Sequence, residues 1–270
     1  IDGQADLYKL DLEVISIDME ALDGIPSDIT NDPTTETSVV VYEEQRQVDL
    51  IVEHDFIERE TIPLDEAASD ILTHDGVAVL YNSNQLNNHD IIKLDLWTME
   101  TTEYVVENPI TKVRLSPDGN HAVATLKPLY DWDNGSLAGY QQSRWGLAVV
   151  DLNSDDVVSL VLESKPVGIE LVEQSGSSFA LVLLEGLEEV LQVELSDPGQ
   201  YASLKLPSPP AGITTNPSGG FTIAHQSPLG QISYLNPAKG SLETTGGFAV
   251  FAFFREDTLP RRLTSKPNEG

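Results

Sequence analysis

The stretch 131–136, Asp-Trp-Asp-Asn-Gly-Ser, contains residue types that could hold a metal ion. Alternating oxygen ligands such as Asp131 and Asp133, followed by a glycine, are one way in which a loop wraps a hard cation such as Ca²⁺. The complete twelve-residue calcium loop also needs a third ligand and a distal Glu, where this chain has Gly135 and Gln142. The pattern therefore predicts a calcium site or, alternatively, a solvated turn.

Large aromatic side chains lie in or beside the same stretch. Loops carried by a rigid scaffold are where binding residues usually sit, and aromatic rings supply much of the contact area in such sites. The alternative is that these rings only cover a neighbouring part of the fold. Of the candidate sites in the sequence we favour this one for a partner or ligand, and its residues are Tyr130, Asp131, Trp132, Asp133, Tyr140 and Trp145.

Histidine and carboxylate side chains offer a second way to bind a metal. The five histidines are scattered, with no pair at the i, i+4 spacing of a helical metal site or the i, i+2 spacing of a strand site. Ligands could converge only through the fold, and the turn residues His74, Asp75 and Asp118 are the candidates. The alternative is that all three are ordinary turn residues.

No residue of the sequence is assigned a catalytic role. Gln174-Ser-Gly-Ser177 lacks the Gly-x-Ser-x-Gly frame of a nucleophile elbow. The glycine pairs at 219–220 and 246–247 lack the spacing and the following helix of a phosphate-binding loop. The chain has no cysteine, which excludes disulfides, thiolate metal sites and a cysteine nucleophile.

An internal repeat positions these candidates. Apolar residues stand just before a series of turns, and the steps between them are 71−29 = 42, 113−71 = 42, 169−113 = 56 and 213−169 = 44 residues. The third step is longer than 42 by 56−42 = 14, and about that many extra residues lie in 129–144. The residues that mark the repeat are Ile29, Ile71, Val113, Ile169 and Ile213.

Each repeat is predicted to form four short strands. In the third copy these are Ile110–Leu115, Ala122–Leu126, Gly146–Leu152 and Val157–Leu162, all with strand-type apolar patterns. Four strands in about 40–45 residues are typical of a β-propeller blade. The sequence therefore predicts an all-β protein with a propeller fold.

The third copy also resembles a known family. Leu-Ser-Pro-Asp-Gly-Asn-His-Ala-Val-Ala at 115–124, followed by a strand that ends Val-Asp-Leu at 150–152, is similar to the blades of TolB-type and YVTN-type bacterial propellers of the WD-repeat-like class. The resemblance spans about residues 5–250 but is clear only in 109–164. Its motif is structural, so it implies a fold and carries no functional residue.

Chain length favours six four-stranded blades in one domain. Without the insertion there are 270−14 = 256 residues, close to six periods of 42. We expect the sixth blade to be shared between the two ends of the chain, which removes free sheet edges, and seven blades is the alternative. The predicted blades are 25–66, 67–108, 109–164, 165–208 and 209–247, with 1–24 and 248–270 sharing the last.

Charge limits the classes of partner. The chain has 44 Asp and Glu residues against 15 Lys and Arg, a net charge of −29, which disfavours a nucleic-acid groove or an anionic membrane surface. No apolar run approaches the roughly 20 residues of a membrane span. Export to the periplasm or the extracellular space is expected from the family resemblance.

These observations favour a non-catalytic binding or scaffold protein. We expect its loops on one face to hold a protein or polymer, with no nucleic acid, no membrane insertion and no required cofactor, Ca²⁺ being the one candidate. The alternative is a metal-dependent, lactonase-like hydrolase with His and carboxylate ligands at the propeller axis. The sequence gives no oligomeric state.

Overall fold

The structure is a computed structural model of the 270-residue chain. The chain forms two compact units, residues 1–161 and 162–270, and each is described by itself. The described residues are 6–11, 16–22, 24–53, 57–85, 88–128, 130–131, 136–137, 144–154, 156–174, 176–216, 220–227, 230–236, 239 and 241–247.

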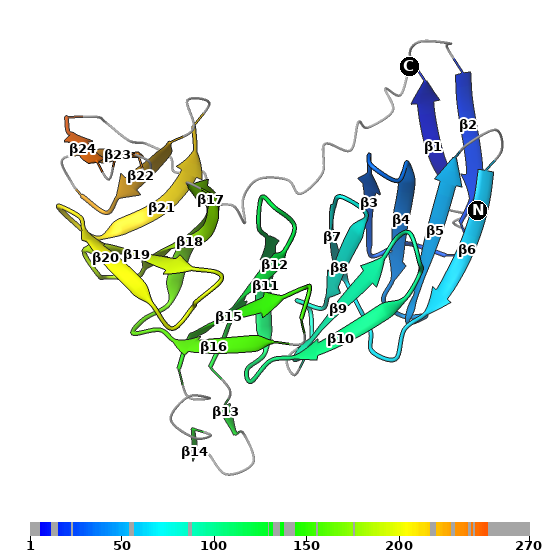
Figure 1. Cartoon of the computed structure of the whole chain (residues 1–270), viewed down its shortest axis with the longest axis horizontal. Coiled ribbons are helices and arrows are strands. Elements are labelled where there is room, and N and C mark those ends of the chain that lie inside the picture. The colour runs from blue at the N-terminus through cyan, green and yellow to red at the C-terminus, as the bar shows by residue number, and fades with distance from the viewer. Residues whose placement is uncertain are drawn as a thin grey trace. The chain divides into compact units, whose positions relative to one another are not determined.

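The N-terminal unit contains a hairpin and three four-stranded antiparallel sheets (Figure 1). The hairpin pairs β1 (Asp6–Asp11) with β2 (Ser16–Ala21). The strands of the first two sheets are β3 (Asp28–Asp32), β4 (Thr37–Tyr42), β5 (Gln47–Glu53) and β6 (Ile57–Pro63), then β7 (Asp70–His74), β8 (Val77–Tyr81), β9 (Asp90–Asp95) and β10 (Thr101–Val105).

The third sheet contains the predicted insertion between its second and third strands. Its order is β11-β12-β15-β16, and the short hairpin β13–β14 branches off between β12 and β15. The strands are β11 (Ile110–Leu115), β12 (His121–Leu126), β13 (Tyr130–Asp131), β14 (Ser136–Leu137), β15 (Gly146–Asp151) and β16 (Val157–Val161).

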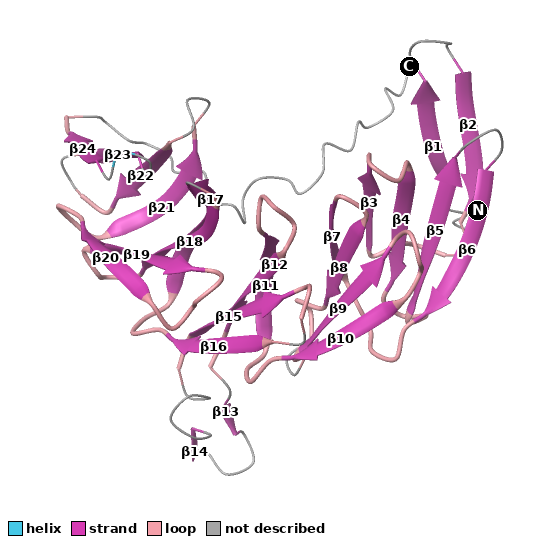
Figure 2. Cartoon of the chain, viewed as in Figure 1, coloured by secondary structure: helices cyan, strands magenta, loops and turns pink. Residues whose placement is uncertain are grey.

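The C-terminal unit contains two more four-stranded antiparallel sheets. The described chain is built from β-strands joined by turns and loops (Figure 2). No helix in the described residues is long and apolar enough to cross a membrane. The strands of this unit are β17 (Pro166–Gln174), β18 (Ser177–Leu184), β19 (Glu189–Glu194), β20 (Tyr201–Lys205), β21 (Pro210–Thr215), β22 (Phe221–His225), β23 (Ile232–Asn236) and β24 (Ser241–Thr245).

Alternation of side chains along β8 shows why these short strands are stable. Successive residues of a strand point to opposite faces of the sheet. Ala78 and Leu80 join the apolar cluster of the first sheet, whereas Val79 and Tyr81 join the cluster of the third sheet. A strand buried on both faces needs apolar residues at every position, and this explains the run Val77–Tyr81.

The same packing operates inside the C-terminal unit. Leu181 and Leu183 of β18 lie in one buried cluster with Phe221 and Ile223 of β22. The predicted pattern of four strands per repeat is confirmed in the five four-stranded sheets of the described residues. Residues 248–270 lie outside the described residues, so the shared sixth blade remains a prediction.

Antiparallel order places particular turns together. Within a sheet, the turn after the first strand and the turn after the third strand lie at the same end. We call this end of the N-terminal unit the turn face. Five of its six turns lie in the described residues, namely 32–37, 74–77, 95–101, 115–121 and, without residue 155, 151–157; residues 54–56 of the sixth turn, 53–57, lie outside them. The insertion follows β12 and so begins at the opposite end.

Candidate functional site

The structure describes only part of the insertion that the sequence favoured. Tyr130 and Asp131 form β13, which pairs with β14. Trp145 is half-buried just before β15. Trp132, Asp133 and Tyr140 lie outside the described residues, so the binding patch and the calcium loop remain predictions.

Asp118 and Asp131, one from each predicted set of metal ligands, lie beyond opposite ends of β12. Asp118 precedes β12 and Asp131 follows it. The six residues of this strand, at about 3.3 Å each, place its ends about 20 Å apart. The two sets are therefore separate candidates. Within the described residues, no group of three or more His, Asp or Glu side chains is arranged to hold a metal ion.

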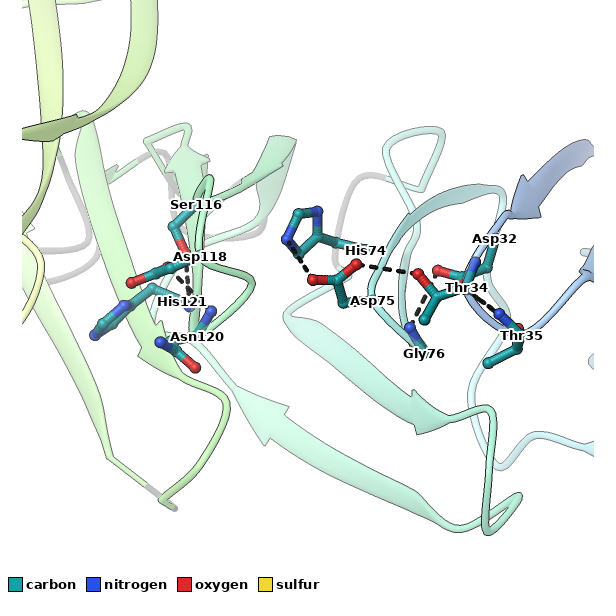
Figure 3. A network of polar contacts seen from close by, with 10 residues as sticks. All are labelled: Asp32, Thr34, Thr35, His74, Asp75, Gly76, Ser116, Asp118, Asn120 and His121. Atoms are coloured by element: carbon teal, nitrogen blue, oxygen red, sulfur yellow. Dashed lines mark hydrogen bonds and ion pairs between the residues drawn. The ribbon is translucent and has the colours of Figure 1, made fainter. Parts of the chain in front are cut away.

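Asp32 joins the turn faces of the first two sheets (Figure 3). Its side chain is fully buried. Oδ1 accepts hydrogen bonds from Thr34 N at 3.1 Å, Thr35 N at 2.9 Å and Thr35 Oγ1 at 3.2 Å. Oδ2 accepts one from Gly76 N, in the next sheet, at 3.1 Å. A carboxylate with four donors is fully engaged, so Asp32 acts as a structural clamp. We did not predict this clamp, although Asp-Pro-Thr-Thr at 32–35 is a recognisable turn signal.

Asp75 and Gly76 form the two-residue turn between β7 and β8. Their φ angles are 44° and 81°, which fits a type I′ hairpin turn and its preference for Asp-Gly. Thr34 Oγ1 donates to Asp75 Oδ1 at 3.1 Å, and His74 Nε2 lies 3.6 Å from Asp75 Oδ2. The Asp75 side chain is nevertheless 75% exposed. The structure thus brings the predicted residues His74 and Asp75 together at the surface.

His74 also contacts the third sheet. A Cβ atom added to Gly119 would lie 2.5 Å from His74 Cδ2, so the imidazole lies directly against this glycine. Polar contacts thus join the turns of the first two sheets, the turn of the third sheet has its own set of hydrogen bonds, and the His74 ring packs between them against Gly119 (Figure 3).

Asp118 serves its own turn. Its Oδ1 accepts from Ser116 Oγ at 2.5 Å and from Asn120 N at 3.1 Å. Ser116 Oγ in turn accepts from His121 N at 2.9 Å and is almost fully buried. The Ser, Asp and His of this segment thus close a hairpin, and the serine is not presented as a nucleophile.

Trp97 is an exposed aromatic residue that the sequence analysis did not single out. It lies in the turn between β9 and β10 and is 65% exposed. Asp95 Oδ1 accepts from Trp97 N at 2.9 Å, and Leu96 N donates to Gly76 O at 2.8 Å. The indole covers Gly76, because an added Cβ there would lie 2.2 Å from Trp97 Nε1.

The repeat itself does not require tryptophan at this position. In the third sheet, Asp151 Oδ1 accepts from Asn153 N at 2.8 Å, and Leu152 N donates to Asn120 O at 2.8 Å. These contacts match those around Trp97 and identify Asn153 as its counterpart. Asn153 Nδ2 then donates to Asn120 Oδ1 at 2.9 Å. A small polar residue is therefore sufficient to form this turn. A comparison of the repeats at this position could have found Trp97.

The turn face is acidic. Its five described turns contain no Lys or Arg. The turns at the opposite end of the same unit contain Arg46, Lys127 and Arg144. The described acidic residues of the turn face are Asp32, Glu36, Asp75, Asp95, Glu100, Asp118, Asp151 and Asp156.

A carboxyl pair lies away from the turn face, on β9 and β10. Burial raises the pKa of Asp90, and the nearby Glu66 raises it further. Burial and the charge of Asp90 likewise raise the pKa of Glu103. The two groups also share a side-chain hydrogen bond, which favours one proton held between them.

The C-terminal unit contains a buried serine–histidine pair. His225 Nε2 lies 2.7 Å from Ser233 Oγ, and His225 Nδ1 lies 2.9 Å from Ser208 O. Because a carbonyl oxygen only accepts, Nδ1 carries the proton and Nε2 accepts from the serine. Ser233 is fully buried and also bonds Thr244 Oγ1 at 2.7 Å. This arrangement links β22, β23 and β24 and gives a substrate no access to the serine.

Comparisons with known proteins identify the fold. No protein-family model and no curated protein matches the sequence. The chain is similar to the solved structure of dihydro-heme d1 dehydrogenase NirN in complex with DHE, with 12% identity and a TM-score of 0.59 over 90% of this chain. It spans 53% of that structure's chain, about half its length.

Two further solved structures are similar. Hydrazine synthase of Kuenenia stuttgartiensis has 17% identity and a TM-score of 0.50, over 86% of this chain and 70% of its own. A catalytically inactive virginiamycin B lyase of Staphylococcus aureus with quinupristin has 13% identity and a TM-score of 0.49, over 90% and 77%. At these identities the likeness to the first structure identifies the fold alone, an all-β propeller with five four-stranded sheets in the described residues.

Proposed function

We propose that this protein is a non-catalytic binding module, an exported bacterial propeller of the TolB or YVTN type, that holds a protein or polymer through the turn face of its N-terminal unit. One observation carries the proposal. Trp97 presents a 65% exposed indole at a position where the repeat needs only a small polar residue.

Exposing this ring to water is energetically unfavourable, and its contacts within the protein offset only part of that free energy. Burial of a large apolar side chain stabilises a protein by about 1.5–3 kcal/mol, and Trp97 gains only part of that by covering Gly76. Its backbone N–H donates to Asp95, and the N–H of the preceding residue, Leu96, donates to Gly76 O. A rigid, exposed aromatic ring is well suited to a partner, since little side-chain entropy is lost on contact.

The polar groups nearby support binding in preference to catalysis. The buried carboxylate of Asp32 has four donors, and Ser116 is engaged by Asp118 and His121. A nucleophile or general base must reach the substrate, and neither group is free to do so.

The test compares the full chain with two variants against a panel of random peptides and neutral polysaccharides. Trp97→Ala should remove or strongly weaken every ligand that the wild-type chain enriches. Tyr201→Ala is the control, because Tyr201 is 62% exposed on a different unit, and it should retain those ligands. Full retention by Trp97→Ala would refute the proposal, and circular dichroism checks that both variants fold.

A further inference from the structure

We infer that Trp97 and Asp75 together bind an Arg or Lys side chain of a basic polypeptide segment. This inference rests on the proposed function and names the chemical class of its partner. The surface concerned consists of Thr34, His74, Asp75, Gly76 and Trp97, and we call it the Trp97 patch.

The patch joins an aromatic face to a carboxylate. The indole covers Gly76, and Asp75 precedes Gly76 in the chain. The Asp75 side chain is 75% exposed. A cation near the face of a tryptophan is attracted by the π-system, and an adjacent carboxylate adds a charge-assisted hydrogen bond.

Asp75 is positioned but retains free acceptor capacity. Thr34 Oγ1 occupies one acceptor position of Oδ1, and His74 lies beside Oδ2 at 3.6 Å. An ionised carboxylate offers about four lone-pair sites, so a guanidinium fork or an ammonium group can still bind. Among the described residues, no Lys or Arg forms an ion pair with Asp75.

Charge complementarity selects a basic partner over other occupants. The turn-face segments contain no Lys or Arg, and the whole chain has a net charge of −29. Lys93 is a lysine of the neighbouring strand β9, and its Nζ already donates to Leu152 O at 2.6 Å. A surface with this excess of carboxylates attracts basic chains and slows the approach of acidic ones.

Two substitutions separate the contributions without disturbing the turn. Asp75→Asn removes the charge, yet asparagine tolerates the positive φ of 44° and can still accept from Thr34. Trp97→Leu keeps an apolar side chain over Gly76 but removes the π-face. Matched controls are Glu173→Gln, an equal charge change on an exposed residue of the other unit, and Tyr201→Leu.

The experiment titrates the full chain with a peptide of alternating Arg and Gly and measures affinity by calorimetry. A peptide with citrulline in place of Arg has the same shape without the charge. We expect the citrulline peptide to bind several-fold more weakly, and Trp97→Leu and Asp75→Asn each to weaken Arg-peptide binding by about two- to five-fold. Both controls should bind as the wild type does.

Each other outcome has a defined meaning. Equal affinity for the two peptides, or unchanged binding by Trp97→Leu, would overturn the inference. A neutral polysaccharide bound through Trp97 with no preference for Arg would overturn it and leave the proposed function standing. Concentration-dependent self-association that Asp75→Asn abolishes would identify a second copy of the chain as the occupant. Loss of no ligand in any Trp97 variant would refute both proposals.

Discussion

Replacement of Asp32 should destabilise the N-terminal unit, because its carboxylate holds the backbone N–H groups of two neighbouring turns. The carboxylate is fully buried and accepts from three backbone N–H groups and one hydroxyl. Asp32→Ala leaves the buried N–H groups of Thr35 and Gly76 without their acceptor. A buried donor left unsatisfied costs about 1–3 kcal/mol, and water entering the exposed turn recovers part of this. We expect a net loss of about 2–4 kcal/mol in the free energy of unfolding.

Asp32→Asn separates the hydrogen bonds from the shape of the side chain. The amide oxygen can accept on one side, but its NH₂ group then faces an N–H donor on the other. If the oxygen serves Thr35, the contact with Gly76 N becomes donor against donor. The free energy of unfolding of this variant should therefore fall by about 1–3 kcal/mol, with the lost hydrogen bond confined to one of the two turns.

Urea unfolding followed by circular dichroism measures the loss, and amide hydrogen exchange localises it. The amides of Thr35 and Gly76 should exchange faster in both variants. Asp75→Asn is the control, because the same chemical change is made in the adjacent turn on a 75% exposed side chain, and it should cost less than about 0.5 kcal/mol. Stability within 0.5 kcal/mol of wild type for Asp32→Ala, with protection of the Gly76 amide unchanged, would refute the clamp.

Two further substitutions test the other polar groups. The folded pKa of Glu103 is raised by burial and Asp90, so native stability falls as pH rises from the ordinary Glu range through this raised value. The free energy of unfolding of Glu103→Gln should therefore exceed that of the wild type by less than about 1 kcal/mol at pH 7 and equal it below about pH 4. A difference of the same size at both pH values in urea unfolding would contradict this. Ser233→Ala removes the donor to buried His225 Nε2 and should cost about 1–3 kcal/mol in urea unfolding, so a neutral result would show that this bond contributes nothing.

The strands and the repeat could be predicted because they depend on local pattern. Strands buried on both faces show apolar runs such as Val77–Tyr81, and Asp-Gly at 75–76 is a strong hairpin signal. The role of Asp32 could not be predicted, since its fourth donor, Gly76 N, lies 44 residues away. Pairing between sheets depends on how blades stack, which local patterns do not encode.

The candidate site was harder to predict for a related reason. His74 and Asp75 were named for metal binding, and the structure instead gives them neighbours in adjacent turns, Thr34 and Gly119. The insertion is conspicuous in the sequence because the period of the repeat breaks there. Yet Trp97 lies where the period holds and only the residue type departs from it.

In a repeat fold, comparison of equivalent turns shows which positions the structure needs and which are free to serve a function. In three sheets the third strand is followed by a leucine whose N–H bonds a carbonyl in or beside the first turn: Leu96 bonds Gly76 O, Leu152 bonds Asn120 O and Leu195 bonds Ser178 O. The next residue is then free to vary, and it is Trp97, Asn153 or Ser196. Asn153 Nδ2 donates to Asn120 Oδ1, and Ser196 Oγ donates to Glu194 Oε1. Trp97 directs a large ring to solvent, so its identity is best explained by a partner, and the Arg-peptide titration tests that explanation.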